Sequence, residues 1–283
     1  MKKFTVILSA LLLSVSTLRA EWPGFTWSVG ADVTSNYLWR GLNLGGLAFQ
    51  PDVMIGYGGL EIEGWANLSP TDYTFKTFAP ELDMTISYNL FGLRVGITHY
   101  HYFDGSKYFN FKGSDFAAYK ADDYNTNQTE VFAEYHLGDV LESVPLSIGW
   151  YTYILGDDRY AVLDPATNDS VMKQAYSSYL ELSYDFCFEK VGLTLTPTIG
   201  ITPWTSFYTD FDTKKGFAVN NISLKLSWDF QAGEHATISL YGLGMLNTHG
   251  ITTGKDGNLF PVIKDTYNNR HLNFAIGLGV YLE

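Results

Sequence analysis

The last strand-length segment of the chain, residues 272–282, alternates strictly between large apolar side chains and mostly small or polar ones. The apolar set comprises Leu272, Phe274, Ile276, Leu278, Val280 and Leu282. Because side chains along a β-strand alternate between two faces, this set forms one wholly apolar face. The segment is also as long as the ~9–11 residues that a tilted strand needs to cross a bilayer. The pattern predicts a membrane-spanning strand if it recurs along the chain.

The same alternation recurs in twelve segments of the sequence. They are about 25–39, 47–57, 60–68, 81–90, 93–103, 128–137, 145–154, 176–186, 191–203, 218–230, 235–246 and 272–282. Links after even-numbered segments are short, whereas links after odd-numbered segments are longer and include 41–46, 104–127, 204–217 and 247–270. Short turns at one end and long loops at the other are typical of an outer-membrane barrel, and an even strand count leaves both chain ends on the periplasmic side.

Aromatic side chains on the apolar face gather beside the short links, as in an interfacial girdle of a membrane barrel. They are Phe25, Trp27, Tyr57, Tyr88, Tyr135, Tyr184, Phe186, Trp228 and Phe230. We assign Trp39, Trp150 and Tyr176 to a second girdle. In lipid all backbone polar groups must be paired, which a closed barrel achieves. We therefore predict an all-β fold, a closed antiparallel transmembrane β-barrel of about twelve strands with short periplasmic turns and long extracellular loops.

Composition favours this fold class over two alternatives. Charged residues make up only 17% of the chain and aromatic residues 16%. Beyond the N-terminus, no apolar run approaches the ~18 residues that would predict a spanning helix. A soluble β-sandwich would bury the apolar face, but it leaves the alternation of loop lengths unexplained.

The N-terminus has the pattern of an export signal. Two lysines precede a short apolar core, and Ala20 offers a small residue before the cut. We therefore expect a signal peptide at 1–20, a barrel at 21–283 and a location in the outer membrane of a Gram-negative bacterium. The expected partners are the lipid bilayer and, through the C-terminal strand, the barrel-assembly machinery.

Charge restricts the partners further. The formal net charge is −12, and loss of Lys2, Lys3 and Arg19 with the signal peptide makes it −15. A chain this acidic argues against nucleic acid as a partner and indicates either cations or a negatively charged channel lining, with small solutes or ions as the expected partners. The single cysteine, Cys187, allows no internal disulfide. No cofactor motif is evident in the sequence.

The segment from Ala31 to Gly41 resembles the opening strand of the TorF-like family of Gram-negative outer-membrane porins. The first strand of that family ends in a Ser-x-Tyr-x-x-Arg-Gly pattern, which Ser35, Tyr37, Arg40 and Gly41 meet here. The likeness covers about the first 70 residues, and beyond them it extends only to the strand pattern. It implies an outer-membrane barrel with a transport role and no defined substrate.

If the apolar face meets lipid, the opposite face lines the interior. We predict that the charged residues on that face line a pore. They are Asp32, Arg40, Glu61, Glu63, Glu81, Asp83, Arg94, Glu130, Glu134, Glu181, Asp185, Lys225 and Asp229. Rings of acidic side chains favour cations. Alternatively, the acids pair with the few bases and fill a closed interior. Twelve strands lie between the ~8 of filled barrels and the ~16–18 of open channels, so we expect a narrow, partly occluded pore.

Two segments have alternative interpretations. Arg40 is either a constriction charge facing Asp52 or Glu63, or an anchor of the first loop through such a pair, with Gly41 permitting the turn. The aromatic-rich loop 104–127 folds into the barrel, binds a ligand outside it, or is an ordinary surface loop.

Histidine positions give little support for metal or enzyme chemistry. His99 and His101 share one strand face and could bind a metal, but without a fixed third ligand the favoured interpretation is a pair of interfacial histidines. His136 shares the interior face with Glu134, yet no nucleophile motif accompanies the pair. We therefore expect that the protein is not an enzyme.

The sequence as a whole predicts a porin-like channel for passive diffusion of small solutes, with a preference for cations. The alternatives are a closed structural or surface-interaction barrel without conductance and, less favoured, a barrel hydrolase with a histidine beside a nucleophile at the outer rim.

Overall fold

The computed structural model describes residues 24–70, 78–103, 108–112, 126–209, 211, 216–247 and 272–283. The predicted signal peptide and most of the predicted loops 104–127 and 247–270 lie outside these residues. In the described part, no helix is long and apolar enough to cross a membrane. The 3₁₀ helices found there are η2 (Leu137–Asp139), η3 (Glu189–Val191) and η4 (Phe207–Thr209).

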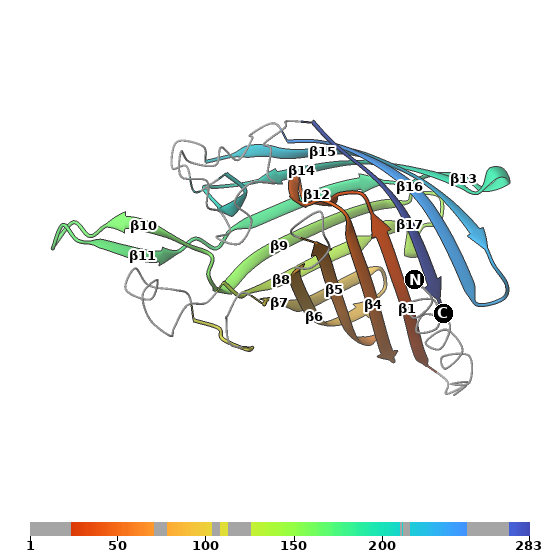
Figure 1. Cartoon of the computed structure of the whole chain (residues 1–283), viewed down its shortest axis with the longest axis horizontal. Coiled ribbons are helices and arrows are strands. Elements are labelled where there is room, and N and C mark those ends of the chain that lie inside the picture. Colours follow the sequence, from red (N-terminus) through yellow and green to blue (C-terminus); the bar gives the residue numbers. More distant parts are fainter. Residues whose placement is uncertain are drawn as a thin grey trace.

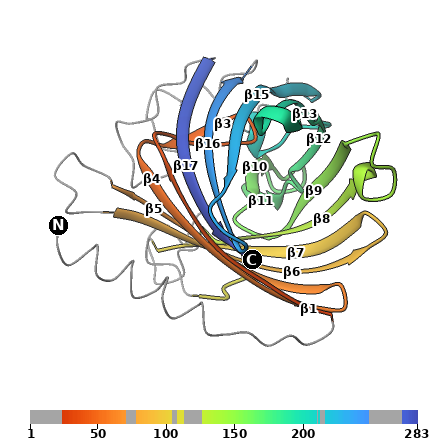
Figure 2. The same cartoon turned by 90° about the vertical axis from the view of Figure 1, so that its right-hand side faces the viewer.

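Twelve strands form one closed antiparallel barrel, which confirms the predicted fold class (Figure 2). Around the ring they are β1 (Phe25–Thr34), β4 (Ala48–Tyr57), β5 (Leu60–Pro70), β6 (Phe78–Leu90), β7 (Leu93–Tyr102), β8 (Gln128–His136), β9 (Leu146–Gly156), β12 (Ser178–Tyr184), β14 (Leu193–Thr202), β15 (Ala218–Gln231), β16 (Ala236–Leu246) and β17 (Leu272–Leu282). The shorter strands are β2 (Tyr37–Trp39), β3 (Leu42–Gly45), β10 (Arg159–Leu163), β11 (Ser170–Gln174) and β13 (Phe186–Phe188). β13 follows β12 in the chain and, like β12, pairs with β14.

The first and last strands close the ring. β1 pairs with β4 on one side and β17 on the other, so Ala31 lies opposite both Pro51 and Val280. Because every wall strand has two neighbours, the backbone polar groups of the wall find partners within it, as a lipid environment requires.

Tight turns join the strands at one end of the barrel, which we call the turn end. Gly58 and Gly59 connect β4 to β5 with φ of 58° and 92°, and Phe91 and Gly92 connect β6 to β7 with φ of 50° and 77°. Two consecutive positive φ angles match the twist of a two-residue hairpin. The β10–β11 hairpin projects from the opposite end, which we call the loop end (Figure 1).

The outer surface carries the apolar face that the alternation predicts. On β17, Ile276 exposes 71% of its surface, and Phe274 and Leu278 are exposed beside it. Equivalent exposed residues on other strands include Val53, Ile55, Ile62, Ile86, Ile97, Val131, Ile148, Leu182, Ile199, Leu224, Leu226 and Leu240. An apolar surface on a closed barrel with a paired backbone is the surface that meets lipid.

The predicted first strand, 25–39, is wrong beyond Thr34. There the Ile276 N–H donates to Ser35 Oγ (3.0 Å), and the Asn36 amide donates to a second backbone group of β17 (2.6 Å). The Ser35 N–H still donates to the Ile276 carbonyl (2.9 Å), so these side-chain bonds accompany the last backbone bond to β17 before the chain leaves the wall for the interior.

The predicted outer loop 41–46 instead belongs to an inward hairpin of β2 and β3. Arg40 and Gly41 form its tip with φ of 46° and 86°, and Leu42 is buried. Trp39, which we assigned to the second girdle, packs instead against the buried cluster around Leu42. The alternation gave no sign of this reversal, because Trp39 continues the apolar parity of β1.

Part of the predicted outer loop 204–217 also turns inward. Phe207 and Tyr208 of η4 are both buried. Ser206 fixes the turn, because its hydroxyl accepts the Tyr208 N–H (3.2 Å) and lies 2.7 Å from the Thr202 hydroxyl. A single 3₁₀ turn has no strand periodicity, so the alternation could not predict it.

Candidate functional site in the barrel interior

The tip of the β2–β3 hairpin places Arg40 against β8. Its guanidinium makes a two-pronged ion pair with Glu130, with Nη1–Oε2 at 2.6 Å and Nη2–Oε1 at 3.0 Å. Tyr208 accepts a further bond from Nη1 (3.0 Å), and Tyr100 donates to Glu130 Oε1 (3.0 Å). Glu130 is only 1% exposed, so the pair is removed from water. Burial is the largest influence on the pKa of Arg40 and lowers it, but Glu130, Tyr208 and Tyr100 together outweigh burial and raise that pKa above its ordinary value.

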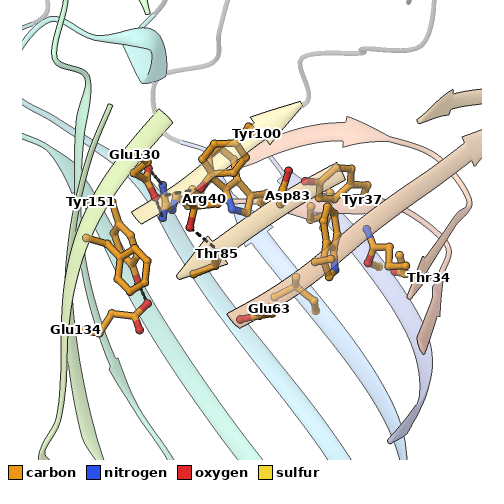
Figure 3. Close-up of a pocket in the computed structure, with 18 of the residues that line it drawn as sticks. Thr34, Tyr37, Arg40, Glu63, Asp83, Thr85, Tyr100, Glu130, Glu134 and Tyr151 are labelled. Atoms are coloured by element: carbon orange, nitrogen blue, oxygen red, sulfur yellow. Dashed lines mark hydrogen bonds and ion pairs between the residues drawn. The ribbon is translucent and has the colours of Figure 1, made fainter. Parts of the chain in front are cut away.

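Aromatic rings enclose the Arg40 guanidinium. Its Cζ lies 3.7 Å from the ring centre of Tyr151, 4.5 Å from that of Trp39 and 5.2 Å from that of Tyr179. Figure 3 shows Arg40 where Tyr100, Glu130 and Tyr151 converge. Cation–π attraction adds up to ~2 kcal/mol at desolvated sites, so the rings stabilise the charge together with Glu130.

The hairpin is fixed to opposite walls of the barrel. Asn43 Nδ2 donates to Asn273 Oδ1 on β17 (3.1 Å), and Asn220 Nδ2 on β15 donates to the Arg40 carbonyl (3.1 Å). β8, which carries Glu130, lies six strands from β17 in either direction around the ring. The hairpin therefore crosses the lumen from one wall to the other.

Only glycine fits beside Arg40 at the hairpin tip. A Cβ on Gly41 would lie 2.2 Å from the backbone oxygen of Asn220. The Gly41 carbonyl accepts a bond from Asn247 Nδ2 (2.9 Å). The tip is thus pressed against β15 by backbone contact as well as by asparagine side chains.

A second charged cluster surrounds Arg94 of β7, closer to the turn end. Its guanidinium contacts Glu63 (3.1 Å), Glu134 (3.2 Å) and Glu61 (3.8 Å). Arg94 Cζ also lies 5.1 Å from the ring centre of Phe132. One guanidinium among several carboxylates leaves this part of the interior negative, and all members of the cluster keep some contact with water.

Other predicted pore residues lie apart from these two clusters, and hydroxyl groups donate to most of them, although Asp32 Oδ1 is buried without a hydrogen-bond partner among the described residues. The pairs are Tyr281 with Asp32 (2.6 Å), Tyr179 with Glu181 (2.7 Å), Thr196 with Asp185 (2.5 Å), and Tyr37 and Tyr102 with Glu81. Lys225 Nζ lies 4.9 Å from the ring centre of Tyr241, and Asp229 is exposed.

A cavity of about 420 Å³ lies between the hairpin and the Arg94 cluster (Figure 3). The predicted residues that line it are Arg40, Glu63, Asp83, Arg94, Glu130 and Glu134. The predicted residues outside its lining are Asp32, Glu61, Glu81, Glu181, Asp185, Lys225 and Asp229. Asp83 Oδ1 is buried and has no hydrogen-bond partner among the described residues. The cavity is therefore the place where the structure brings charged side chains of the interior together.

Aromatic side chains that were not among the predicted pore residues also line this cavity. They are Tyr37, Trp39, Trp65, Tyr100, Phe132, Tyr151 and Tyr241. The alternation does predict that most of them face inward. Trp65 lies two residues after Glu63 on the same face of β5, and Phe132 lies between Glu130 and Glu134 on the same face of β8.

The partner that we predicted for Arg40 is wrong. The prediction placed Arg40 at the end of the first wall strand, beside Asp52 and Glu63. The inward hairpin carries it across the lumen instead, so its ion pair forms with Glu130. Glu63 pairs with Arg94.

His99 and His101 lie on the outward face of β7, and both are nearly buried. Their Nδ1 atoms lie 3.0 Å from Thr129 Oγ1 and 3.0 Å from Asn127 Oδ1, respectively. Aromatic rings of segment 108–112 pack against both imidazoles. Among the described residues, no three metal-ligating side chains form a group that could hold a metal.

His136 and Glu134, which share the interior face, make only a loose contact, with His136 Nε2 3.8 Å from the carboxylate. His136 Nδ1 lies 3.0 Å from Ser147 Oγ, so the three side chains follow one another in space. Glu134 also accepts bonds from Arg94 (3.2 Å) and Tyr151 (2.7 Å). These donors hold the carboxylate for the Arg94 cluster and reduce its capacity to orient His136.

Twelve strands closed into an antiparallel ring, with an apolar exterior and a charged interior, define a transmembrane β-barrel. No family model matches the chain, and no curated protein matches it. Membership of the TorF-like family therefore stays a prediction.

Several solved structures are similar to the chain at low identity. An outer membrane channel from Pseudomonas putida F1 is 14% identical, with a TM-score of 0.42, over 92% of this chain and 95% of that chain. The CymD monoaromatic hydrocarbon channel is 8% identical, with a TM-score of 0.39, over 92% and 88%. OmpF of Salmonella typhi, in complex with daunomycin, is 7% identical, with a TM-score of 0.35, over 91% and 97%. Likenesses at this level carry no argument about family or activity.

Proposed function

We propose that the protein is an outer-membrane, porin-like channel for passive diffusion of small solutes, with a preference for cations. One observation carries the proposal, namely the excess of carboxylates on the interior face. Asp32, Asp52, Glu61, Glu63, Glu81, Asp83, Glu130, Glu134, Glu181, Asp185 and Asp229 stand there against Arg40, Arg94 and Lys225. A low-dielectric wall focuses the field of such charges into the lumen, where it raises the local concentration of cations.

The ion pairs leave most of this excess in place. Glu130 pairs with Arg40 and neutralises its charge, and carboxylates of β5 and β8 share the charge of Arg94. The hydroxyl groups that bond to Asp32, Glu181 and Asp185 orient those carboxylates without supplying positive charge. An anion in the lumen would therefore meet repulsion that a cation would not.

A second candidate is a closed barrel that conducts nothing. The observation in its favour is the hairpin that crosses the lumen between β17 and β8. In that case the interior network serves rigidity, and function belongs to the loop end. We place this candidate second because charged groups line the cavity between the hairpin and the Arg94 cluster. A purely structural interior would be at least as stable with well-packed apolar side chains in their place.

The outer-membrane location, export by a signal peptide and recognition of β17 by the barrel-assembly machinery belong to the same proposal. The apolar exterior supports them, because such a surface needs a bilayer.

The deciding experiment is the reversal potential of the refolded protein in a planar bilayer under a potassium chloride gradient. We expect discrete current steps and a potential shifted towards cation selectivity. The triple variant Glu63→Gln, Asp83→Asn and Glu181→Gln should weaken the selectivity. A matched control removes equal charge at the turn end, with Asp139→Asn, Glu142→Gln and Glu189→Gln, and should change it little. A silent bilayer despite confirmed insertion would favour the closed barrel, and selectivity equal in both triple variants would contradict the lumen assignment.

A further inference from the structure

Each basic side chain of the interior lies against an aromatic ring. Arg40 Cζ lies 3.7 Å from the Tyr151 ring centre, Arg94 Cζ lies 5.1 Å from that of Phe132, and Lys225 Nζ lies 4.9 Å from that of Tyr241. The two arginines also contact carboxylates on their other sides. This interior thus repeatedly holds a nitrogen cation between a carboxylate and a ring.

Asp83 has the same kind of surroundings without a basic side chain. In the antiparallel ladder it lies directly between Trp65 of β5 and Tyr100 of β7. No ion pair within 4.0 Å joins Asp83 to a base of the described residues, and its buried Oδ1 has no hydrogen-bond partner there. A buried carboxylate oxygen without a partner is costly, and a bound ligand, ion or water that supplies the missing interaction would account for it.

The space beside Asp83 is large enough for a small organic molecule. Asp83, Trp65 and Tyr100 all line the cavity of about 420 Å³, a size within the ~300–1,000 Å³ of small-molecule sites. Glu63 lines the same cavity and adds negative potential. Tyr37, whose ring centre lies 5.6 Å from that of Trp65, extends the aromatic wall on the hairpin side (Figure 3).

We propose that Asp83, Trp65 and Tyr100 form a binding site for a small organic ammonium ion. A cation in the cavity favours the ionised form of the Asp83 carboxyl group, which then supplies the counter-charge. The rings supply cation–π attraction and apolar contact for the alkyl groups. Potassium and sodium ions carry tightly held hydration shells that the rings cannot replace. Alkylammonium ions are weakly hydrated, so they enter such a cage at lower cost. This inference rests on the proposed function, because it names the class of solute that the proposed channel would carry.

Its test does not depend on current through the channel. The refolded barrel in non-ionic detergent is dialysed to equilibrium against radiolabelled tetramethylammonium, with potassium chloride in excess to hold the ionic strength. We expect saturable binding that potassium does not displace. Asp83→Asn, which keeps the shape and removes the charge, should weaken binding at least about tenfold, as expected for loss of a charged partner. Trp65→Leu should weaken it about three- to fivefold.

Two controls make the result decisive. Asp83→Glu keeps the charge and should retain binding within about threefold, whereas Asp139→Asn makes the same chemical change as Asp83→Asn on an exposed turn-end helix and should have no effect. Non-saturable binding, displacement by potassium, or equal binding by wild type and Asp83→Asn would overturn the proposal. If Asp83→Asn fails to fold, Trp65→Leu and the competition with potassium decide it. Binding by a protein that passes no current would keep this site and remove the proposed channel function.

Discussion

Arg40 and Glu130 form a more deeply buried ion pair than any other among the described residues. Removing one partner leaves the other charge uncompensated and out of water. We therefore expect Arg40→Gln and Glu130→Gln each to lower the free energy of unfolding by ~3–5 kcal/mol. The double variant should cost clearly less than the sum, and urea unfolding from liposomes would measure this cycle. Additive costs would mean that the two charges do not depend on each other.

Asp158, between β9 and β10, allows a prediction about pH. Ser177 N–H (2.8 Å) and the Gln174 amide (3.2 Å) donate to its carboxylate. Burial, which outweighs these bonds, raises the pKa of Asp158 to about 6 from 3.8. The folded state thus holds the proton more tightly than the unfolded chain, so this contribution to stability is complete below pH ~4 and lost as pH rises through ~6. The difference amounts to about 3 kcal/mol.

Asp158→Asn mimics the protonated carboxyl and should not show this loss. The unfolding free energy of the variant minus that of wild type should therefore rise by about 2.5 kcal/mol between pH 4 and pH 7.5. Urea titrations at the two pH values would measure it, and the subtraction cancels groups that titrate equally in both proteins. A difference that stays constant with pH would show that burial does not shift the pKa of Asp158.

Sequence alone could place Glu130 but not its partner. Glu130 faces inward because Val131 and Ala133 set the parity of β8, and the structure exposes Val131 on the outer surface. The ladder that orders the wall relates only neighbouring strands. Arg40 is 90 residues from Glu130 and reaches it on a segment that has left the wall. Parity therefore predicts which face a residue occupies, whereas contacts across the lumen depend on where a segment departs from the ladder.

Among the elements, the β2–β3 hairpin offers the sharpest test of occlusion. Thr34 and Ala48 are already opposite each other in the β1–β4 ladder. Excision of 37–45 therefore leaves Ser35, Asn36, Gly46 and Leu47 as a four-residue turn between the same two strands. We expect the barrel to fold and its single-channel conductance to rise severalfold, because the segment that crosses the lumen is gone. Planar bilayer recordings would measure the change.

Excision of the β10–β11 hairpin, residues 159–174, is the matched control, since that hairpin projects from the loop end away from the lumen (Figure 1). It should leave the conductance close to that of wild type. An unchanged current after excision of 37–45, in a protein that still folds, would show that the inward hairpin does not limit passage.

The wall strands were predictable as elements because the period of two persists over about ten residues in each. The inward hairpin was not, because Tyr37 and Trp39 keep the apolar parity of β1. What diverts the chain is local polar chemistry at Ser35 and Asn36, whose side chains occupy backbone partners on β17. The alternation of apolar residues does not predict such bonds.

For the whole molecule, the two faces of the wall should differ in their tolerance of charge. Ile276 on β17 shares a rung with Gly242, and Gly242 in turn shares one with Leu226 on β15. Lys225, the residue before Leu226, lies on the interior face at nearly the same depth. The native protein therefore already holds a lysine there, on the face away from lipid.

We expect Ile276→Lys to lower the free energy of unfolding by ~2–4 kcal/mol, as for a lysine facing lipid near the midplane. Ser227→Lys, on the interior face just beyond Leu226, should cost within ~1 kcal/mol, because water and the surrounding carboxylates can receive the ammonium group. Urea titration of both variants refolded into the same liposomes would measure the difference. Equal costs would mean that the outer surface is not buried in lipid at this depth, while a larger cost for Ser227→Lys would mean that the interior is dry and packed there, as in a closed barrel. The two measurements thus test which face of the wall meets lipid and whether the lumen holds water. The proposed channel requires a water-filled lumen.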